Sequence, residues 1–188
     1  MSFEQKLGEF ELINSFFAPL SEQEAGAFGL SDDAAVLSPP LNKQLVFTTD
    51  GLTAGVHFLD DENPRDVAAR LIGTNLSDLA AMGAKPWVYT LTLALPNDLD
   101  TDWLSNFSKE LKILQERFAI SLIGGDTTAT PGPLTVSLTA IGTVSRGRAL
   151  LRSGARAGDL IYVSGTIGDA TLGLAVLQGK IGGLNEKY

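Results

Sequence analysis

The stretch NPRDVAARLIGTNLSDLAAMG (63–83), followed closely by WVYTLTLALP (87–96), decides the fold that the sequence predicts. Asn63 and Pro64 form a favourable helix start, because proline suits the first helical position, and Gly83 is a suitable stop. Between them apolar residues recur every three or four positions. The second segment is a short apolar run, typical of a buried strand. A helix leading into a buried strand predicts a domain that packs both kinds of element around one core.

Other segments supply the rest of the predicted layers. Residues 8–20 and 101–118 carry apolar side chains at helical spacing, and 166–178 has the pattern of a final helix. Short apolar runs predict strands, two of which, 34–37 and 44–49, flank the turn signal PPLNK. We therefore predict an α+β (α/β two-layer) domain in which a mixed sheet is covered by helices on one face. The remaining predicted strands are 119–125, 134–145 and 159–165.

Composition narrows the classes of function. The chain has 188 residues, a net charge of −8, no cysteine and one histidine, His57. No apolar run approaches the length of a membrane span, and the N-terminus lacks a signal-peptide pattern, so we expect neither a membrane nor export. The negative charge argues against a nucleic-acid partner, since that affinity comes mainly from lysine and arginine. The absence of cysteine excludes disulfides and suits a cytoplasmic protein, which is the location that we expect.

Four short stretches place a carboxylate among small residues, with no lysine or arginine beside it. Two unit charges about 4 Å apart at an effective dielectric of about 20 repel by about 4 kcal/mol, so carboxylates that converge need a cation. Mg²⁺ held by carboxylates usually completes its shell with substrate phosphates, which predicts a Mg–nucleotide site. The stretches are SDDAA (31–35), TTD (48–50), NLSDLAAMGA (75–84) and GGDTT (124–128), and their carboxylates are Asp33, Asp50, Asp78 and Asp126.

Each carboxylate also has an ordinary structural interpretation. Asp33 could cap a turn, and Asp50 followed by glycine is a common turn signal. Asp78 falls on the same stripe as the apolar residues of the predicted helix 63–83, where we expect it to face inward. An unpaired carboxylate there is costly, so it must be paired, protonated or metal-bound, unless it caps a second short helix. The glycines before Asp126 could simply form a tight turn.

Direct phosphate-binding signals are weaker. No G-x-x-x-x-G-K-[ST] sequence occurs, which excludes the P-loop mode of holding a triphosphate. The segment SGTIGDA (164–170) precedes a predicted helix and could cradle an anion, although we favour a structural turn. Arginine suits forked contact with phosphate oxygens, but at least two members of the one basic cluster are expected to be merely solvated. That cluster consists of Arg146, Arg148, Arg152 and Arg156.

Taken together, these motifs resemble the N-terminal half of the thiamine-monophosphate kinase family, within the aminoimidazole ribonucleotide synthetase-like superfamily. The most specific pair is TTDGLTAGVHF (48–58) with NLSDLAAMGAKP (75–86). The resemblance implies direct, Mg²⁺-assisted transfer of the γ-phosphoryl group of ATP to thiamine monophosphate, with no covalent catalytic residue. It also implies a homodimer whose N-terminal sheets pair into a barrel. The other matching segments are GEFELI (8–13), SDDAAVL (31–37), TLALP (92–96), LIGGDTT (122–128), GRALLRSGARAGD (147–159) and YVSGTIGDA (162–170).

The resemblance also implies domains and residue roles. Residues 1–150 would form an N-terminal ATP- and Mg²⁺-binding and dimerisation domain, and 151–188 the start of a truncated C-terminal domain, so we expect the fragment alone to be inactive. Ser31 stands where the family has glycine, which could alter the turn that positions Asp33. The implied contacts are Asp33, Thr48, Thr49, Asp50, Asp78 and Asp126 to several Mg²⁺ ions, Gly125, Asp126 and Arg152 to ATP, and His57 to thiamine monophosphate.

Two alternatives remain open from the residues. The first is a different enzyme of the superfamily, such as an ATP-dependent cyclo-ligase. The second is a nucleotide-binding dimerisation module without chemistry.

Overall fold

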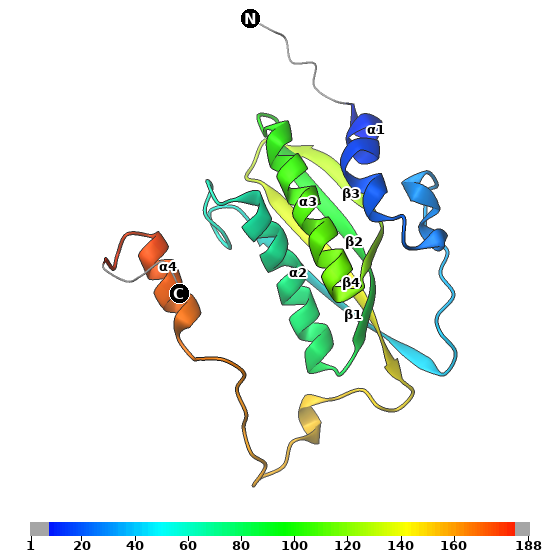
Figure 1. Ribbon diagram of the computed structural model, residues 1–188, viewed down its shortest axis with the longest axis vertical. Helices are drawn as coiled ribbons and strands as arrows, with labels where there is room; N and C mark the ends of the chain where they lie inside the picture. Colours follow the sequence, from blue (N-terminus) through cyan, green and yellow to red (C-terminus); the bar gives the residue numbers. More distant parts are fainter. Residues whose placement is uncertain (1–7, 183–188) are drawn as a thin grey trace, which may run out of the picture. The chain divides into compact units, whose positions relative to one another are not determined.

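The structure is a computed structural model in which residues 8–182 are described (Figure 1). The chain divides into two units, Met1–Leu151 and Arg152–Tyr188. The expected boundary was between residues 150 and 151, and the roles assigned to the two parts stay predictions. In the part of the chain that is described, no helix is both long and apolar enough to cross a membrane.

The first unit is built on a four-stranded sheet in the order β1-β4-β2-β3. Strand β4 lies antiparallel to both β1 and β2, whereas β2 and β3 are parallel, so the sheet is mixed. Parallel neighbours need a crossover connection, and helix α3 provides it. Strands β1 and β3 are the two edges. The bounds are β1 (Lys43–Thr53), β2 (Lys85–Pro96), β3 (Ser121–Thr130) and β4 (Thr135–Ser145).

Helices α2 (Pro64–Ala81) and α3 (Thr101–Phe118) lie side by side across one face of this sheet (Figure 1). The Asn63 side chain caps α2, since its Oδ1 accepts a hydrogen bond from the backbone N–H of Arg65 at 3.0 Å, and proline follows at the first helical position. The helix, the strand after it and the second helix were all predicted from the sequence. An α+β fold with a mixed sheet under helices is therefore confirmed.

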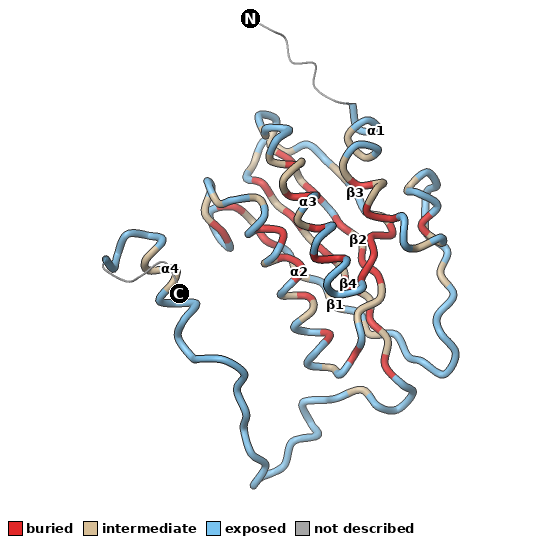
Figure 2. Tube along the Cα trace, in the orientation of Figure 1, coloured by how far each residue is buried: buried red, intermediate tan, exposed pale blue. Residues whose placement is uncertain are grey.

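The core lies between the helices and the covered face of the sheet (Figure 2). Strand β4 shows the difference between the covered and uncovered faces of the sheet most clearly, because buried and half-buried residues alternate along it. Its apolar side chains pack under the helices, whereas hydroxyl-bearing residues line the uncovered face, where Thr49 Oγ1 and Thr139 Oγ1 lie 2.8 Å apart. Completely buried members of the core include Val67, Leu71, Tyr89, Leu93, Phe107, Leu111 and Leu138.

Three segments differ from the sequence predictions. Residues 8–20 are helical, but as three short pieces: α1 (Glu9–Leu12), a π-helical turn (Ile13–Phe17) and a 3₁₀ turn (Ala18–Leu20). Residues 34–37 are not a strand, and neither are residues 159–165. A strand needs a neighbour for its backbone hydrogen bonds and cover for its side chains. In the second segment Ile161 is 94% exposed, so that cover is missing.

The second unit contains a 3₁₀ turn (Arg152–Gly154) and helix α4 (Asp169–Leu177). The helix was predicted over 166–178 and is confirmed within those limits. Residues 164–168, which include the glycine-rich segment, form bends and irregular backbone before it.

Candidate functional site

A cavity of about 630 Å³ lies beside the edge strand β3. Part of its wall is apolar and includes Phe10, Ile13 and Leu122, and part is acidic. Its lining residues include no lysine or arginine. Among residues 8–182 the acidic wall therefore has no cation of its own, so we expect a polyphosphate to enter with metal ions between the two sets of charges. The carboxylates of the lining are Glu9, Asp32, Asp33 and Asp126.

Asp33 reaches this cavity from a loop with an unusual backbone. Phe28, Gly29 and Leu30 all have positive φ angles, of 51°, 64° and 60°. Ser31 then returns to φ −96° and ψ −12°, a conformation open to any L-residue, and its hydroxyl donates a hydrogen bond to the carbonyl of Phe28 at 2.7 Å. Serine, where the resemblance implied glycine, is thus accommodated without strain. The left-handed geometry precedes Ser31.

Gly125 and Asp126 come from β3, where that strand runs beside β2. A Cβ atom at residue 125 would lie 1.7 Å from the carbonyl oxygen of Leu91. Only glycine therefore allows the two strands to approach at this position. Asp126 follows in register with Thr92, and its side chain is exposed at the rim of the cavity.

A second acidic group lies at the opposite edge of the sheet. The carboxylate Oδ2 of Asp78, on α2, accepts a hydrogen bond from the hydroxyl of Thr48, on β1, at 2.6 Å. Asp78 is exposed, so the prediction that it faces inward is wrong. Asp78 is exposed because it lies above β1, which is the edge strand of the sheet, and no further strand among the described residues covers this side of α2. The inward positions of this half of α2 are Asn75 and Leu79.

Thr49 and Asp50 follow Thr48 on β1. Asp50 is half-buried, and its backbone carbonyl accepts a hydrogen bond from Ser137 Oγ at 3.1 Å. Side chains alternate along a strand, so the Thr49 side chain points to the uncovered face, where it contacts Thr139. Its hydroxyl is therefore directed away from Asp78 and Thr48.

One chain does not bring the predicted carboxylates to one point. The strand register places Asp50, Leu138, Leu91 and Gly125 in a single row across the sheet. Three strand spacings separate the ends of that row, about 14 Å, which is too far for Asp50 and Asp126 to bind the same ion. Within residues 8–182, no group of three or more His, Cys, Asp or Glu residues is arranged to hold a metal. The sequence prediction of one shared point within a chain is therefore replaced by two acidic edges.

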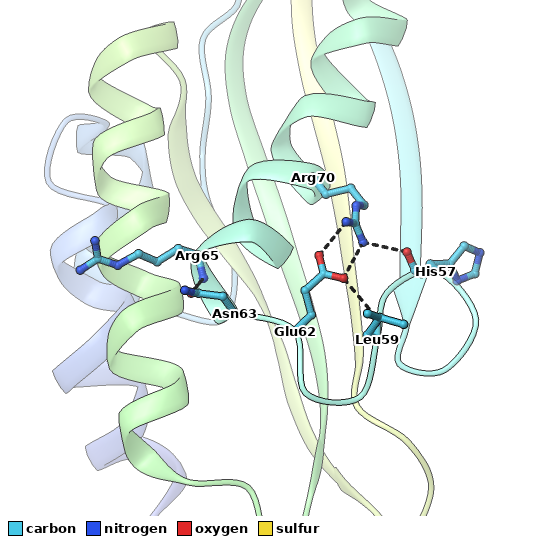
Figure 3. A network of polar contacts seen from close by, with 6 residues as sticks. All are labelled: His57, Leu59, Glu62, Asn63, Arg65 and Arg70. Carbon is cyan, nitrogen blue, oxygen red and sulfur yellow. Dashed lines mark hydrogen bonds and ion pairs between the residues drawn. The ribbon is translucent and has the colours of Figure 1, made fainter. Parts of the chain in front are cut away.

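His57 lies in the loop that follows β1, and its side chain is exposed. The loop is held by an ion pair between Arg70 and Glu62 and by hydrogen bonds to its backbone (Figure 3). Sequence reasoning missed Arg70 and Glu62. Arg70 occupies a half-buried flank of α2, and Glu62 precedes the helix, so no periodic pattern connects them.

Arg152 opens the 3₁₀ turn of the second unit and is exposed, as are Arg146, Arg148 and Arg156. Its predicted contact with ATP stays a prediction.

Residues 31–144 match the family model of the AIR synthase related protein, N-terminal domain. The chain belongs to this family, and what it contains is that N-terminal domain.

Within that class the chain is a homologue of thiamine-monophosphate kinase. It is 48% identical over 175 residues to the thiamine-monophosphate kinase of Escherichia coli K12, covering 93% of this chain and 53% of the relative. It is 44% identical to the Caulobacter vibrioides protein of the same name, covering 92% of this chain and 49% of the relative. The chain thus spans about half the length of the curated relatives it matches.

Solved structures of thiamine-monophosphate kinases share the fold of this chain. The thiamine-monophosphate kinase of Stenotrophomonas maltophilia K279a has a TM-score of 0.74 and 48% identity, covering 80% of this chain and 47% of that one. AaThiL complexed with AMPPCP and TMP has a TM-score of 0.70 and 33% identity, covering 100% of this chain and 57% of that one. The hydrogenase maturation protein HypE, at 24% identity and a TM-score of 0.72, shares the fold alone.

Proposed function

We propose that this chain is the nucleotide- and Mg²⁺-binding half of a thiamine-phosphate kinase, which transfers the γ-phosphoryl group of ATP directly to thiamine monophosphate. The observation that carries the proposal is the 33% identity, over the whole of this chain, to a protein solved with AMPPCP and TMP. The 48% identity to a named thiamine-monophosphate kinase supports the same substrate. The relatives reported above at 44–48% identity are named thiamine-monophosphate kinases, which favours that activity over a superfamily cyclo-ligase.

The donor atoms of the two acidic edges fit magnesium. Carboxylate and hydroxyl oxygens are the hard ligands that Mg²⁺ prefers, and the cavity carboxylates have no neutralising side chain among its lining residues. When bound, the ions would neutralise charge on the phosphates and orient them for in-line transfer. Asp33 and Asp126 would hold metal from one edge, and Thr48, Asp50 and Asp78 from the other.

The remaining residues would position substrates rather than form covalent intermediates. Phosphoryl transfer depends mainly on alignment and charge stabilisation, and the acceptor is already a phosphate whose oxygen needs no strong base. Gly125 lines the cavity, so its backbone groups can contact a ligand there. We therefore expect no phospho-enzyme. Radioactive phosphate retained covalently after treatment with labelled ATP would contradict this.

The two acidic edges also give a reason for a homodimer. If β1 of one copy lies beside β3 of a second copy, the two sheets close into a barrel and the acidic groups of opposite edges meet. Closure also removes both exposed edges of each sheet, which are otherwise prone to unwanted pairing. A complete site would then contain residues from both copies. Light scattering that finds only monomer at high concentration, with Mg²⁺ and ATP present, would refute this arrangement.

Calorimetry of ATP binding tests the proposal. We expect measurable affinity only with Mg²⁺, and we expect Asp78→Asn and Asp126→Asn each to reduce it, because one substitution removes a ligand from each edge. Asp98→Asn is the matched control, since Asp98 is exposed and lies outside the cavity lining and both acidic groups. An ATP affinity that is the same with and without Mg²⁺ would reject the site. An affinity unchanged by both Asp78→Asn and Asp126→Asn would also reject it. We also expect no thiamine diphosphate to be produced by this chain alone.

A further inference from the structure

The loop that carries His57 is held by a forked ion pair (Figure 3). The Arg70 guanidinium contacts both carboxylate oxygens of Glu62, with Nη2 2.6 Å from Oε1 and Nη1 3.3 Å from Oε2. The same Nη1 donates to the backbone carbonyl of His57 at 2.8 Å. Glu62 Oε2 also accepts from the backbone N–H of Leu59 at 3.1 Å. Two side chains thus fix the backbone on both sides of Phe58.

The imidazole ring of His57 is held by the backbone at the end of β1. The backbone N–H of Thr53 donates to Nδ1 of His57 at 3.1 Å, and the backbone N–H of His57 donates to the carbonyl of Thr53 at 2.9 Å. A neutral imidazole has one nitrogen that accepts and one that carries the proton. Since Nδ1 accepts from a backbone donor, the neutral ring carries its proton on Nε2, and no described residue accepts a hydrogen bond from that nitrogen.

We propose that Arg70 and Glu62 are positioning residues that hold His57 as an Nε2–H donor toward the phosphate of a phosphate-monoester substrate. The inference rests on the proposed function, because thiamine monophosphate is the substrate assigned to His57. Arginine suits this task, since its planar fork can bind a carboxylate with two nitrogens while one of them also reaches a carbonyl; a lysine ammonium cannot reproduce that geometry. His57 then orients the acceptor phosphate by donating a proton in a hydrogen bond, and does not act as a base.

The single histidine makes the proposal directly measurable. With ¹⁵N-labelled histidine and backbone, the Thr53–His57 hydrogen bond is expected to show a scalar coupling between the Thr53 amide nitrogen and His57 Nδ1. We expect this coupling in the unmodified chain and its loss in Arg70→Met, Arg70→Lys and Glu62→Gln. Arg65→Met, on the same helix, is the matched control: the Arg65 side chain is exposed and points away from the loop, and the coupling should persist (Figure 3).

Folding is checked separately from positioning. The methyl spectrum of the buried leucines and the urea midpoint report whether a variant keeps its core. Coupling that survives in all three Arg70 and Glu62 variants, or that is absent from the unmodified chain, would overturn the proposal. If Arg70→Met does not fold, the more conservative Glu62→Gln and Arg70→Lys decide the question.

Titration with thiamine monophosphate distinguishes this inference from the proposed function. The His57 Nε2 signal is expected to shift in the unmodified chain, and Arg70→Lys is expected to bind about fivefold more weakly, the equivalent of one hydrogen bond of about 1 kcal/mol. Coupling lost in the variants without any response to thiamine monophosphate would uphold the positioning of the ring and reject the assigned substrate. Equal affinity of Arg70→Lys and the unmodified chain would reject the positioning role in binding.

Discussion

Replacing Gly125 by alanine should disrupt the pairing of β2 and β3, and Gly124 provides a closely matched comparison. The two glycines are adjacent and have φ angles of 159° and 158°, so any cost that a side chain incurs through the backbone is nearly the same. Their surroundings differ. A Cβ at residue 124 has no atom within 4 Å, whereas one at residue 125 would lie 1.7 Å from the Leu91 carbonyl oxygen.

The size of the effect follows from that distance. Ordinary contact begins at 3.4 Å, so the strands would have to separate locally by about the difference, which is enough to break at least two hydrogen bonds of the ladder. At about 1 kcal/mol each, with about 1–3 kcal/mol for overpacking, Gly125→Ala should lower the free energy of unfolding by about 3–5 kcal/mol. Domains of this size are stable by only about 5–15 kcal/mol, so the loss should be conspicuous.

Urea denaturation, followed by fluorescence of Trp87 and Trp103 and by far-UV circular dichroism, measures the difference. We expect a large shift of the midpoint for Gly125→Ala and a much smaller one for Gly124→Ala. A difference of less than about 1 kcal/mol between the two variants would refute the steric argument, because the backbone contribution cancels in the comparison.

Three further substitutions test other features. Tyr89→Phe should raise the free energy of unfolding by about 1 kcal/mol, because the buried hydroxyl has no hydrogen-bond partner among the described residues. Burial raises the pKa of Tyr89 above its usual 10.0, so above about pH 10 the unfolded chain releases this proton and the folded chain does not. The free energy of unfolding of the unmodified chain should therefore fall by about 1.4 kcal/mol per pH unit from this group. Tyr89→Phe should lack this contribution to the fall. Gly73→Ala should stabilise α2 by about 1 kcal/mol in thermal unfolding, since the position is exposed and an added Cβ meets open space. Thr48→Val removes the hydrogen bond to Asp78 and should weaken Mg²⁺-dependent ATP binding in calorimetry. Its free energy of unfolding in urea should stay within about 1 kcal/mol of the unmodified chain.

Much of the first unit could be predicted because its local signals agree with its packing. The sequence 63–83 contains a cap, a proline at the first helical position and an apolar stripe, and α2 forms there. The runs that became β2 and β4 are long enough to be covered by the helices on one face. Residues 34–37 and 159–165 have similar composition but no partner strand. Strand formation depends on a neighbour that sequence composition does not reveal.

The candidate site was predictable in its residue types but not in its arrangement. Asp78 lies on the same side of an ideal helix as Leu71, yet it is exposed because the sheet ends at β1 beneath it. Likewise, Asp50 on β1 and Asp126 on β3 are separated because β4 and β2 lie between these two strands in the sheet. Neither fact can be derived from spacing along the chain. The ion pair of Arg70 with Glu62 was missed for the same reason.

The opposite-edge placement of the acidic groups has a consequence for mixed dimers if copies pair as proposed. Asp78→Asn and Asp126→Asn would then damage different halves of each composite site. A hybrid of one copy of each variant would retain one intact site, assembled from the unaltered edge of each partner, alongside one doubly defective site. A mixture of the two variants should therefore recover Mg²⁺-dependent ATP binding at the intact sites of its hybrid dimers, whereas a hybrid of an unaltered copy with a doubly substituted copy should contain no intact site at all.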